Sequence, residues 1–274
     1  TKDDITIEEV KNVNISLYPD LDKEKLTLIW NTGGKNEVVV DNNPIQINTN
    51  CILFISEFHM KIDMSLSSAR IIKFKKTLLS PTDTLKHVGE YLMLFYGAHS
   101  INSIPKITLR NTEVETFDRI WLDLKGEALN IKNPVSEALL RNSFSRLLLL
   151  SEKSHMETAF DIPMDFKELK KIREFQYLVN QNFKELTKVS DYAKLLDVSA
   201  KKISELFGCC YDKKASELIA DRRNLYAKRQ LIFTTQLIKN IAYDLNFSDS
   251  QTFSHFFKKQ NGVTPDDYRK QHES

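Results

Sequence analysis

The sequence predicts an α+β protein of two domains. The first is a β-barrel followed by helices, and the second is an all-α domain in which two similar helical units are joined by a long helix. Three observations support this prediction. The 274 residues exceed the usual size of one domain. Short β-favouring runs precede segments with helical spacing. The C-terminal part contains an internal repeat.

The strand-rich part occupies roughly the first hundred residues. The predicted strands are Leu26–Trp30, Glu37–Val40, Ile45–Ile47, Cys51–Ile55 and Ala69–Phe74. Turn residues at 32–35 and 41–44 separate several of them. We expect Tyr91–Tyr96 to be a last strand. Short strands at this spacing indicate a small sandwich or barrel.

Helical spacing begins after the strand-rich part. One helix face is formed by Val114, Phe117, Ile120, Trp121 and Leu124. A second helix is expected from Val135 to about Leu150, because Pro134 is well placed for a helix start. Its wide apolar band, including Leu147–Leu150, fits burial under the barrel and a seam between two copies about equally well.

We place the first domain at residues 1–150, with helices from about 113, a linker at 151–164 and the second domain at 165–274. Charge divides in a similar way. Residues 164–274 carry 20 Lys and Arg against 15 Asp and Glu, a net +5, whereas residues 1–163 carry 19 against 22, a net −3. A basic C-terminal part is a mild indication of a polyanionic partner, although a solvated helical surface shows the same excess.

Cysteine usage and hydropathy indicate a cytoplasmic protein. The three cysteines are Cys51, Cys209 and Cys210, too few for a disulfide framework and without the spacing of a zinc site. The first ten residues lack the basic start and apolar stretch of a secretory signal. No apolar run is long enough to span a membrane, so we expect no membrane partner.

The internal repeat aligns residues 189–207 with residues 238–257. Each copy holds a small alanine, then an apolar turn residue, then a serine suited to cap the next helix. These are Ala193, Val198 and Ser199 in the first copy, and Ala242, Phe247 and Ser248 in the second. Because alanine is small, two helices can cross closely at a steep angle, as in a helix-turn-helix unit.

The second helix of each copy should expose one polar edge that can reach base edges in the major groove. The candidate residues are Lys201, Lys202, Ser204 and Glu205 in the first copy, and Ser250, Gln251, Thr252, Ser254 and His255 in the second. Lys258 and Lys259 are placed to meet phosphates, which position the protein without specifying sequence.

Ala215–Phe233 contains no Gly or Pro and predicts a rigid helix between the copies. Such a helix would hold the two recognition helices so that they enter successive major-groove turns, roughly 34 Å apart. We expect a basic flank on it, formed by Arg222, Arg223, Lys228 and Arg229.

The second copy and its tail resemble AraC/XylS-type transcription regulators. The matching positions are Ile241-Ala242, Phe247-Ser248-Asp249, Phe253-Ser254, Phe257-Lys258-Lys259, Gly262, Thr264-Pro265 and Tyr268-Arg269. The resemblance covers roughly residues 165–270. Thr264 is suited to cap a helix that begins at Pro265.

The resemblance implies a sequence-specific regulator whose C-terminal domain binds double-stranded DNA. It also implies a cupin-like N-terminal domain that binds a small-molecule effector, forms a homodimer, or does both. RNA polymerase is a further partner to consider. The alternative is an effector-independent regulator whose N-terminal domain only dimerises.

The chain departs from the family pattern at several positions. Asn246 and Asp197 replace the usual Gly before the turn residue, and both tolerate a left-handed backbone. Asp212 stands where Gly is common, and His255 and Glu205 stand where basic residues are frequent. These departures affect which bases are read rather than the mode of binding.

An effector cavity in the barrel would draw on Trp30, Phe54, His59 and Phe74. Each aromatic residue is equally compatible with a core position, and we favour the core because buried aromatic residues are common. A cupin-type metal enzyme fused to a helical module is the remaining alternative. It has little support, since no His-x-His, glycine-rich phosphate loop or Gly-x-Ser-x-Gly occurs. We therefore predict no enzyme activity, no metal and no cofactor.

Overall fold

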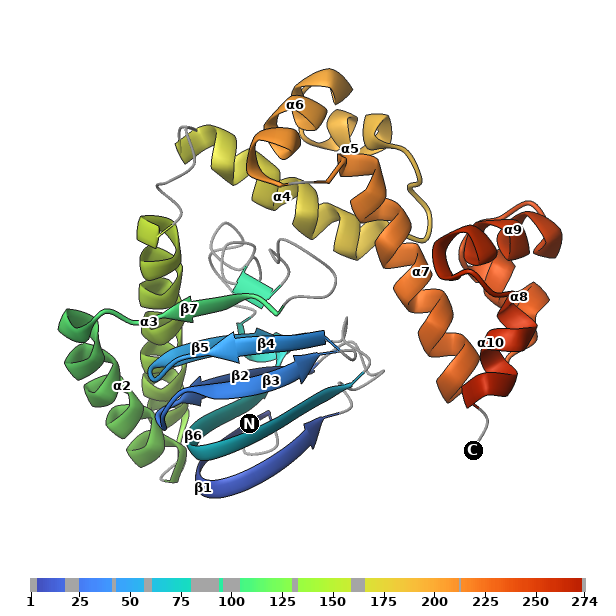
Figure 1. Ribbon diagram of the computed structural model, residues 1–274. Helices are drawn as coiled ribbons and strands as arrows, with labels where there is room; N and C mark the ends of the chain where they lie inside the picture. Colours follow the sequence, from blue (N-terminus) through green and yellow to red (C-terminus); the bar gives the residue numbers. More distant parts are fainter. Residues whose placement is uncertain are drawn as a thin grey trace. The chain divides into compact units, whose positions relative to one another are not determined.

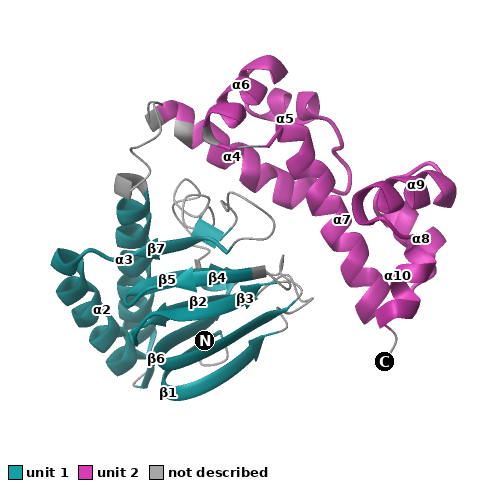
Figure 2. Ribbon diagram, in the orientation of Figure 1, with its two compact units in different colours: residues 1–163 teal, residues 164–274 magenta. Residues whose placement is uncertain are grey.

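The chain forms two compact units, residues 1–163 and residues 164–274, in the computed structural model (Figure 2). The residues that the structure describes are 4–17, 25–40, 43–56, 61–79, 94–95, 104–129, 133–158, 166–211 and 213–272. Each unit has its own hydrophobic core.

The first unit contains a curled, half-barrel antiparallel sheet (Figure 1). Its strands are β1 (Ile5–Leu17), β2 (Lys25–Asn31), β3 (Asn36–Val40), β4 (Asn43–Ile47), β5 (Cys51–Ile55), β6 (Ile62–Lys75) and β7 (Lys106–Thr108). Their order is β4-β3-β6-β2-β5-β7, and β1 also pairs with the long β6. The five predicted strands are confirmed, although β6 begins earlier than expected.

Two strands were not predicted. The sequence of β1 is rich in polar and charged residues, and most of its side chains are exposed or half-buried, so it lacks a strong apolar signal. β7 is short. The strand expected at Tyr91–Tyr96 lies mostly outside the described residues, and the two that are described, Leu94 and Phe95, are helical and buried. This part of the strand prediction was wrong, because a short buried run reads alike in helix and strand.

Two helices follow the sheet in the first unit, after a short 3₁₀ turn at Lys76–Leu79. α2 (Asn111–Leu129) buries the predicted face, including Phe117 and Trp121. α3 (Pro134–Thr158) begins where Pro134 predicted but runs past Leu150 into the segment expected to be a linker. Its last turns contain neither Gly nor Pro, and Ser151 and Ser154 are buried, so nothing local ends the helix there.

Alternate side chains of β2, β5 and β6 point to opposite faces of the sheet. One face carries a buried aliphatic cluster that includes Ile29, Leu53 and Ile71. The other face packs against the helices: the Trp30 ring lies 6.0 Å from that of Phe117 in α2.

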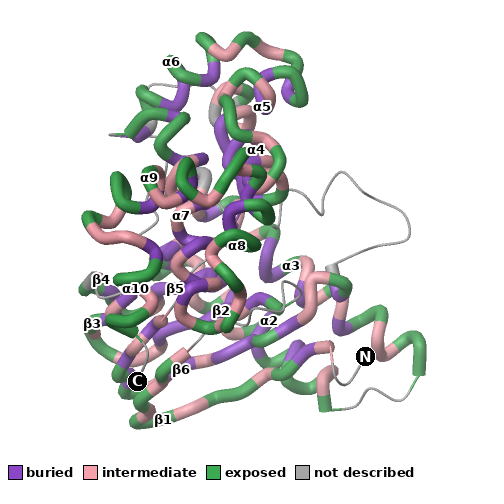
Figure 3. The backbone as a smooth tube through the Cα atoms, turned by 90° about the vertical axis from the view of Figure 1, so that its right-hand side faces the viewer, coloured by how far each residue is buried: buried purple, intermediate pink, exposed green. Residues whose placement is uncertain are grey.

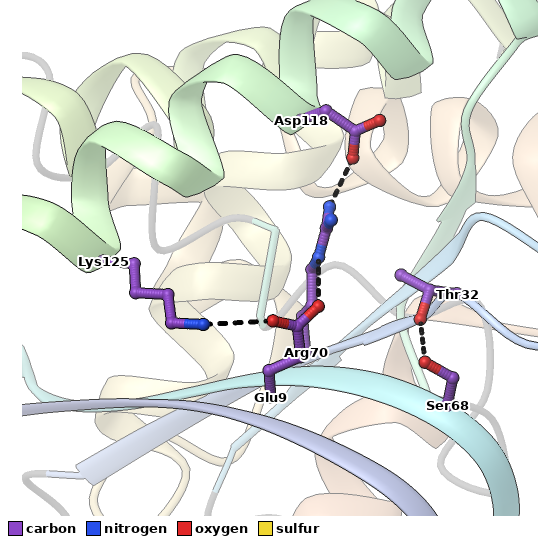
Figure 4. Close-up of polar contacts among 6 residues, drawn as sticks. All are labelled: Glu9, Thr32, Ser68, Arg70, Asp118 and Lys125. Carbon is purple, nitrogen blue, oxygen red and sulfur yellow. Dashed lines mark hydrogen bonds and ion pairs between the residues drawn. The ribbon is translucent and has the colours of Figure 1, made fainter.

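Arg70 of β6 fastens α2 to the sheet (Figure 4). Its guanidinium lies 4.5 Å from the ring centroid of Trp30 and 5.3 Å from that of Trp121. It also donates a hydrogen bond to Asp118 of α2. A second ion pair joins Lys125 of α2 to Glu9 of β1 at 3.1 Å. These contacts link the helix to two strands. The Arg70 side chain is only 15% exposed, which favours its cation–π contacts, whereas Lys125 and Glu9 are exposed, so their ion pair contributes little.

The second unit is helical. Its helices are α4 (Phe166–Asn182), α5 (Val189–Leu195), α6 (Ala200–Cys210), α7 (Ala215–Phe233), α8 (Ile238–Asp244), α9 (Ser250–Asn261) and α10 (Pro265–His272). Figure 1 shows α5 and α6 towards one end of α7, and α8 and α9 towards the other. No helix among the described residues is both long enough and apolar enough to cross a bilayer.

Candidate nucleic-acid interface

Each repeat folds into a helix-turn-helix unit, and the turns of the two units have the same backbone geometry. Asp197 and Asn246 adopt left-handed conformations, with φ of 52° and 56°. In each turn the following residue donates its N–H to the carbonyl of the small alanine, from Val198 to Ala193 and from Phe247 to Ala242, both at 3.0 Å. This is the Schellman pattern of a helix end. The prediction that Asp and Asn substitute for Gly in these turns is confirmed.

The second helix of each unit is capped by a side chain, but by different kinds of residue. Ser199 accepts from Lys202 N at 3.1 Å, as predicted. In the second unit the cap is Asp249, which accepts from Thr252 N at 2.7 Å, and not Ser248. Ser248 instead donates to the Asp249 carboxylate at 2.8 Å. The serine prediction was therefore wrong by one position, since the carboxylate can accept both bonds.

The charge at this cap favours the helix start. The backbone N–H of Thr252, with the hydroxyls of Ser248 and Thr252, holds the pKa of Asp249 below its usual value. A carboxylate is stabilised at the positive end of a helix dipole. The α9 N-terminus is therefore fixed by an ionised residue, whereas the α6 N-terminus is fixed by a neutral one.

Each unit buries the apolar side of its second helix and exposes the polar side (Figure 3). The buried residues are Ile203, Leu206 and Phe207 in α6, and Phe253 and Phe257 in α9, with Phe256 half-buried. The predicted contact residues that are exposed are Lys201, Lys202, Ser204 and Glu205 in α6, and Gln251, Thr252, His255, Lys258 and Lys259 in α9. Ser250 and Ser254 are half-buried.

Several of the candidate contact residues already make hydrogen bonds or ion pairs within the chain. The Ser204 hydroxyl donates to Ala200 O at 2.9 Å, and that of Ser254 donates to Ser250 O at 2.8 Å. In α6, Lys202 Nζ lies 2.6 Å from a carboxylate oxygen of Glu168 in α4, and Lys201 lies 3.7 Å from Glu205. The polar edge of α6 therefore has its charges partly neutralised.

The polar edge of α9 differs. Among the residues that the structure describes, no hydrogen bond or ion pair involves the side chains of Gln251, His255, Lys258 and Lys259. Gln251 offers an amide suited to a bidentate contact with adenine. The lysines at the end of the helix offer charge for phosphates. Within the described residues, these four exposed side chains have no polar partner of their own.

The basic flank expected on α7 is largely absent from the surface. Arg222, Arg223 and Arg229 are all buried. Arg223 Nη2 donates to Leu245 O at 2.6 Å, and its guanidinium lies 4.4 Å from the centroid of the Phe247 ring. The prediction was wrong because apolar and basic residues alternate around this helix, so spacing alone did not identify its buried side.

The proposed effector residues lie in the N-terminal unit, residues 1–163. Trp30, Phe54 and Phe74 are all buried on the sheet face that carries the aromatic contacts. Phe54 lies 5.3 Å from Phe95. His59 falls outside the described residues. No His, Cys, Asp and Glu side chains gather into a metal-binding group within the described parts of the chain.

The sequence did not show the structural roles of two residues, Arg223 and Glu168. Arg223 caps a turn carbonyl in the second unit, and Glu168 pairs with a candidate contact residue. Both act across helices distant in sequence. Only a three-dimensional arrangement shows such contacts, so no local signal was available for either residue.

Tandem helix-turn-helix units with exposed second helices define a class of DNA-binding domain. Comparison with known proteins gives the same class: residues 192–271 match the family model described as a helix-turn-helix domain, of the AraC type. The resemblance predicted from the sequence is confirmed for this domain.

Known relatives are similar over different lengths. The uncharacterized HTH-type transcriptional regulator YtdP of Bacillus subtilis (strain 168) is 41% identical over 59 residues, which cover 22% of this chain and 8% of that protein. A crystal structure of unsaturated fatty acid bound ToxT from Vibrio cholerae strain SCE256 is 16% identical, with 97% of this chain and 94% of that chain covered and a TM-score of 0.40.

A second similar structure is shorter. It is a transcriptional regulator with an AraC-type DNA-binding domain from Chromobacterium violaceum, 24% identical, covering 40% of this chain and 98% of that chain with a TM-score of 0.36.

Proposed function

We propose that this protein is a sequence-specific transcription regulator that reads a DNA site of two half-elements. The observation that carries the proposal is the pair of turns with matching geometry, each followed by a capped helix with an exposed polar edge. Helices of this kind place their N-terminal residues in the major groove. RNA polymerase is the further partner expected of such a regulator.

The test is selection of bound sequences from a random duplex pool with the full chain. We expect a site with two elements about one helical turn apart. Affinity should fall steeply as salt rises, because the exposed lysines would neutralise phosphates. No enrichment, together with affinity independent of salt, would contradict the proposal.

Residue roles within the site can be separated by two kinds of variant. Gln251→Ala and His255→Ala should change which bases are preferred, because these side chains would contact base edges. Lys258→Ala should weaken binding to all duplexes alike and reduce the salt dependence by about one ion. Selections repeated with each variant, and titrations at several salt concentrations, measure both effects.

We propose that the N-terminal unit, residues 1–163, controls DNA binding by forming a homodimer. Large apolar side chains are exposed on its two long helices: Leu122 and Leu129 on α2, and Val135, Leu139 and Leu149 on α3. Exposed apolar groups of this kind favour association. Sedimentation of the full chain tests this proposal: a protein that stays monomeric at micromolar concentration, with and without DNA, would contradict it.

We also propose, from the family resemblance, that a small-molecule effector bound to the N-terminal unit controls DNA binding. Trp30, Phe54 and Phe74 are the candidate contacts, with His59. Thermal shift of the full chain against a metabolite library tests this directly. A ligand that raises the melting temperature and changes DNA affinity would support effector control, whereas a ligand-independent dimer would favour the effector-independent alternative.

A further inference from the structure

Besides the backbone of α7, a series of hydrogen-bonded polar side chains connects the two helix-turn-helix units. Lys184 Nζ donates to the Tyr226 hydroxyl at 2.9 Å. That hydroxyl donates to a carboxylate oxygen of Asp244 at 3.3 Å. Gln236 Nε2 donates to the same oxygen at 2.8 Å. We call these four residues the brace.

The brace joins parts of both units. Lys184 lies in the loop between α4 and α5, which enters the first unit, and Asp244 is the last residue of α8 in the second. Tyr226 lies between them on α7. Nearby, Asn246 Nδ2 in the second turn approaches Glu185 O of that same loop at 3.4 Å. The loop that leads into the first helix-turn-helix is thus hydrogen-bonded directly to the turn that precedes α9.

Packing and protonation favour a persistent brace. Tyr226 is half-buried; its ring lies 4.1 Å from Lys184 Nζ and 5.7 Å from the Phe183 ring. Burial, and then the neighbouring carboxylate of Asp244, raise the pKa of Tyr226 to about 12. The phenol therefore stays protonated at neutral pH, where it can donate to Asp244 while accepting from Lys184.

Residues 234–237, which join α7 to α8, are not helical, and we call them the joint. Beyond the joint, Arg223 of α7 donates to Leu245 O and Asn224 of α7 binds Asn261 of α9, and the brace adds to these contacts. Gln236 lies within the joint and binds Asp244, and Asp244 binds Tyr226. The brace therefore ties both sides of the joint to one residue of α7.

We propose that Tyr226 is a positioning residue that fixes the separation and rotation of α9 relative to α6, and hence the spacing that the protein prefers between two DNA half-elements. This rests on the proposed function. The two recognition helices must match the pitch of the duplex, so a change in their relative rotation shifts or widens the accepted spacing. Tyr226 itself need not touch DNA.

The test uses the full chain and a series of duplexes in which the two selected elements are separated by different numbers of base pairs. The measured quantity is the ratio of affinities at the best spacing and at one base pair more. Tyr226→Phe removes both hydrogen bonds of this hydroxyl. We expect it to lower the ratio at least threefold, since even one lost hydrogen bond changes an equilibrium by about three- to tenfold. Tyr243→Phe, at an exposed tyrosine of α8 outside the brace, should leave the ratio unchanged.

Lys184→Met provides a second variant if Tyr226→Phe does not fold. A uniform loss of affinity from the missing charge cancels in the ratio, so a lower ratio still reports on spacing. A ratio equal to the wild-type value in a folded brace variant overturns the inference while leaving the proposed function intact. Failure of the wild-type chain to select any duplex overturns the proposed function and the inference with it.

Discussion

The two helix-turn-helix units have the same backbone turn but are held by different chemistry. In the first unit, Lys171 Nζ of α4 donates to Leu196 O at 3.0 Å; its side chain is 42% exposed and lies 3.5 Å from Glu174. In the second, Arg223 of α7 donates to the equivalent carbonyl of Leu245 and is buried. A cation from the preceding helix caps the turn in both units, but only one of the cations is shielded from water.

The recognition helices α6 and α9 also differ, in whether their lysines form ion pairs. The lysines of α6 are paired with acidic residues, whereas Lys258 and Lys259 of α9 have no ion pair among the described residues. We infer that the second helix-turn-helix makes the main contacts with bases, and that the first makes a weaker contact, because its lysines are paired with acidic residues. The predictions below test this difference.

The largest expected effect is on stability. Arg223→Ala should destabilise α8 and α9 by about 2–4 kcal/mol, because it leaves a buried carbonyl without its donor and removes packing on Phe247. Lys171→Ala should cost at most about 0.5–1 kcal/mol, since water can replace the exposed ammonium. Hydrogen exchange measured by mass spectrometry gives both values for the relevant helices. Equal losses in the two units would contradict the comparison.

A smaller effect is expected on base recognition. Gln251→Ala should weaken binding to the best site by about 1–3 kcal/mol and relax the preference at one base pair. Ser204→Ala on α6 should change the affinity little, because that hydroxyl already donates to Ala200 O. Titration against the selected duplex and its single-base variants measures both. A larger loss for Ser204→Ala would mean that α6 is the main reader.

Local chemistry made the turns and helices predictable. Asp197 and Asn246 were expected to adopt the left-handed conformation, because those residue types tolerate it. The apolar spacing of Phe117 and Trp121 identified the buried side of α2. Each of these features depends on residues close together in sequence.

Features that depend on distant contacts could not be predicted. β1 is mainly polar, and its pairing with β6 across more than forty residues is what makes it a strand. Arg223 reads as a surface charge until the Leu245 carbonyl and the Phe247 ring are placed beside it. Glu168 becomes relevant to α6 only through the fold.

A gain of affinity is expected from Glu168→Gln. This change removes the carboxylate that pairs with Lys202 at 2.6 Å, so more of the charge of this lysine is available to a phosphate. A surface ion pair contributes up to about 1 kcal/mol, so affinity should rise about two- to fivefold. The salt dependence should steepen by about one ion. Asp266→Asn, which also removes an exposed negative charge but on α10, is the control; an equal gain there would indicate a general charge effect.

The smallest effect concerns the helix caps and pH. Asp249 has a folded-state pKa below that of the unfolded chain, so its stabilisation is fully present above the unfolded value and is lost as pH falls through the folded value. The melting temperature of the wild type should therefore exceed that of Asp249→Ser at pH 6 by more than it does at pH 3. The difference between wild type and Ser199→Ala should not depend on pH, because a hydroxyl cap does not titrate. Comparing differences removes the contribution of the other carboxylates, which titrate in all three proteins. A pH-independent difference for Asp249→Ser would mean that the carboxylate acts only as a hydrogen-bond acceptor, and the electrostatic contrast between α9 and α6 would not extend to their caps.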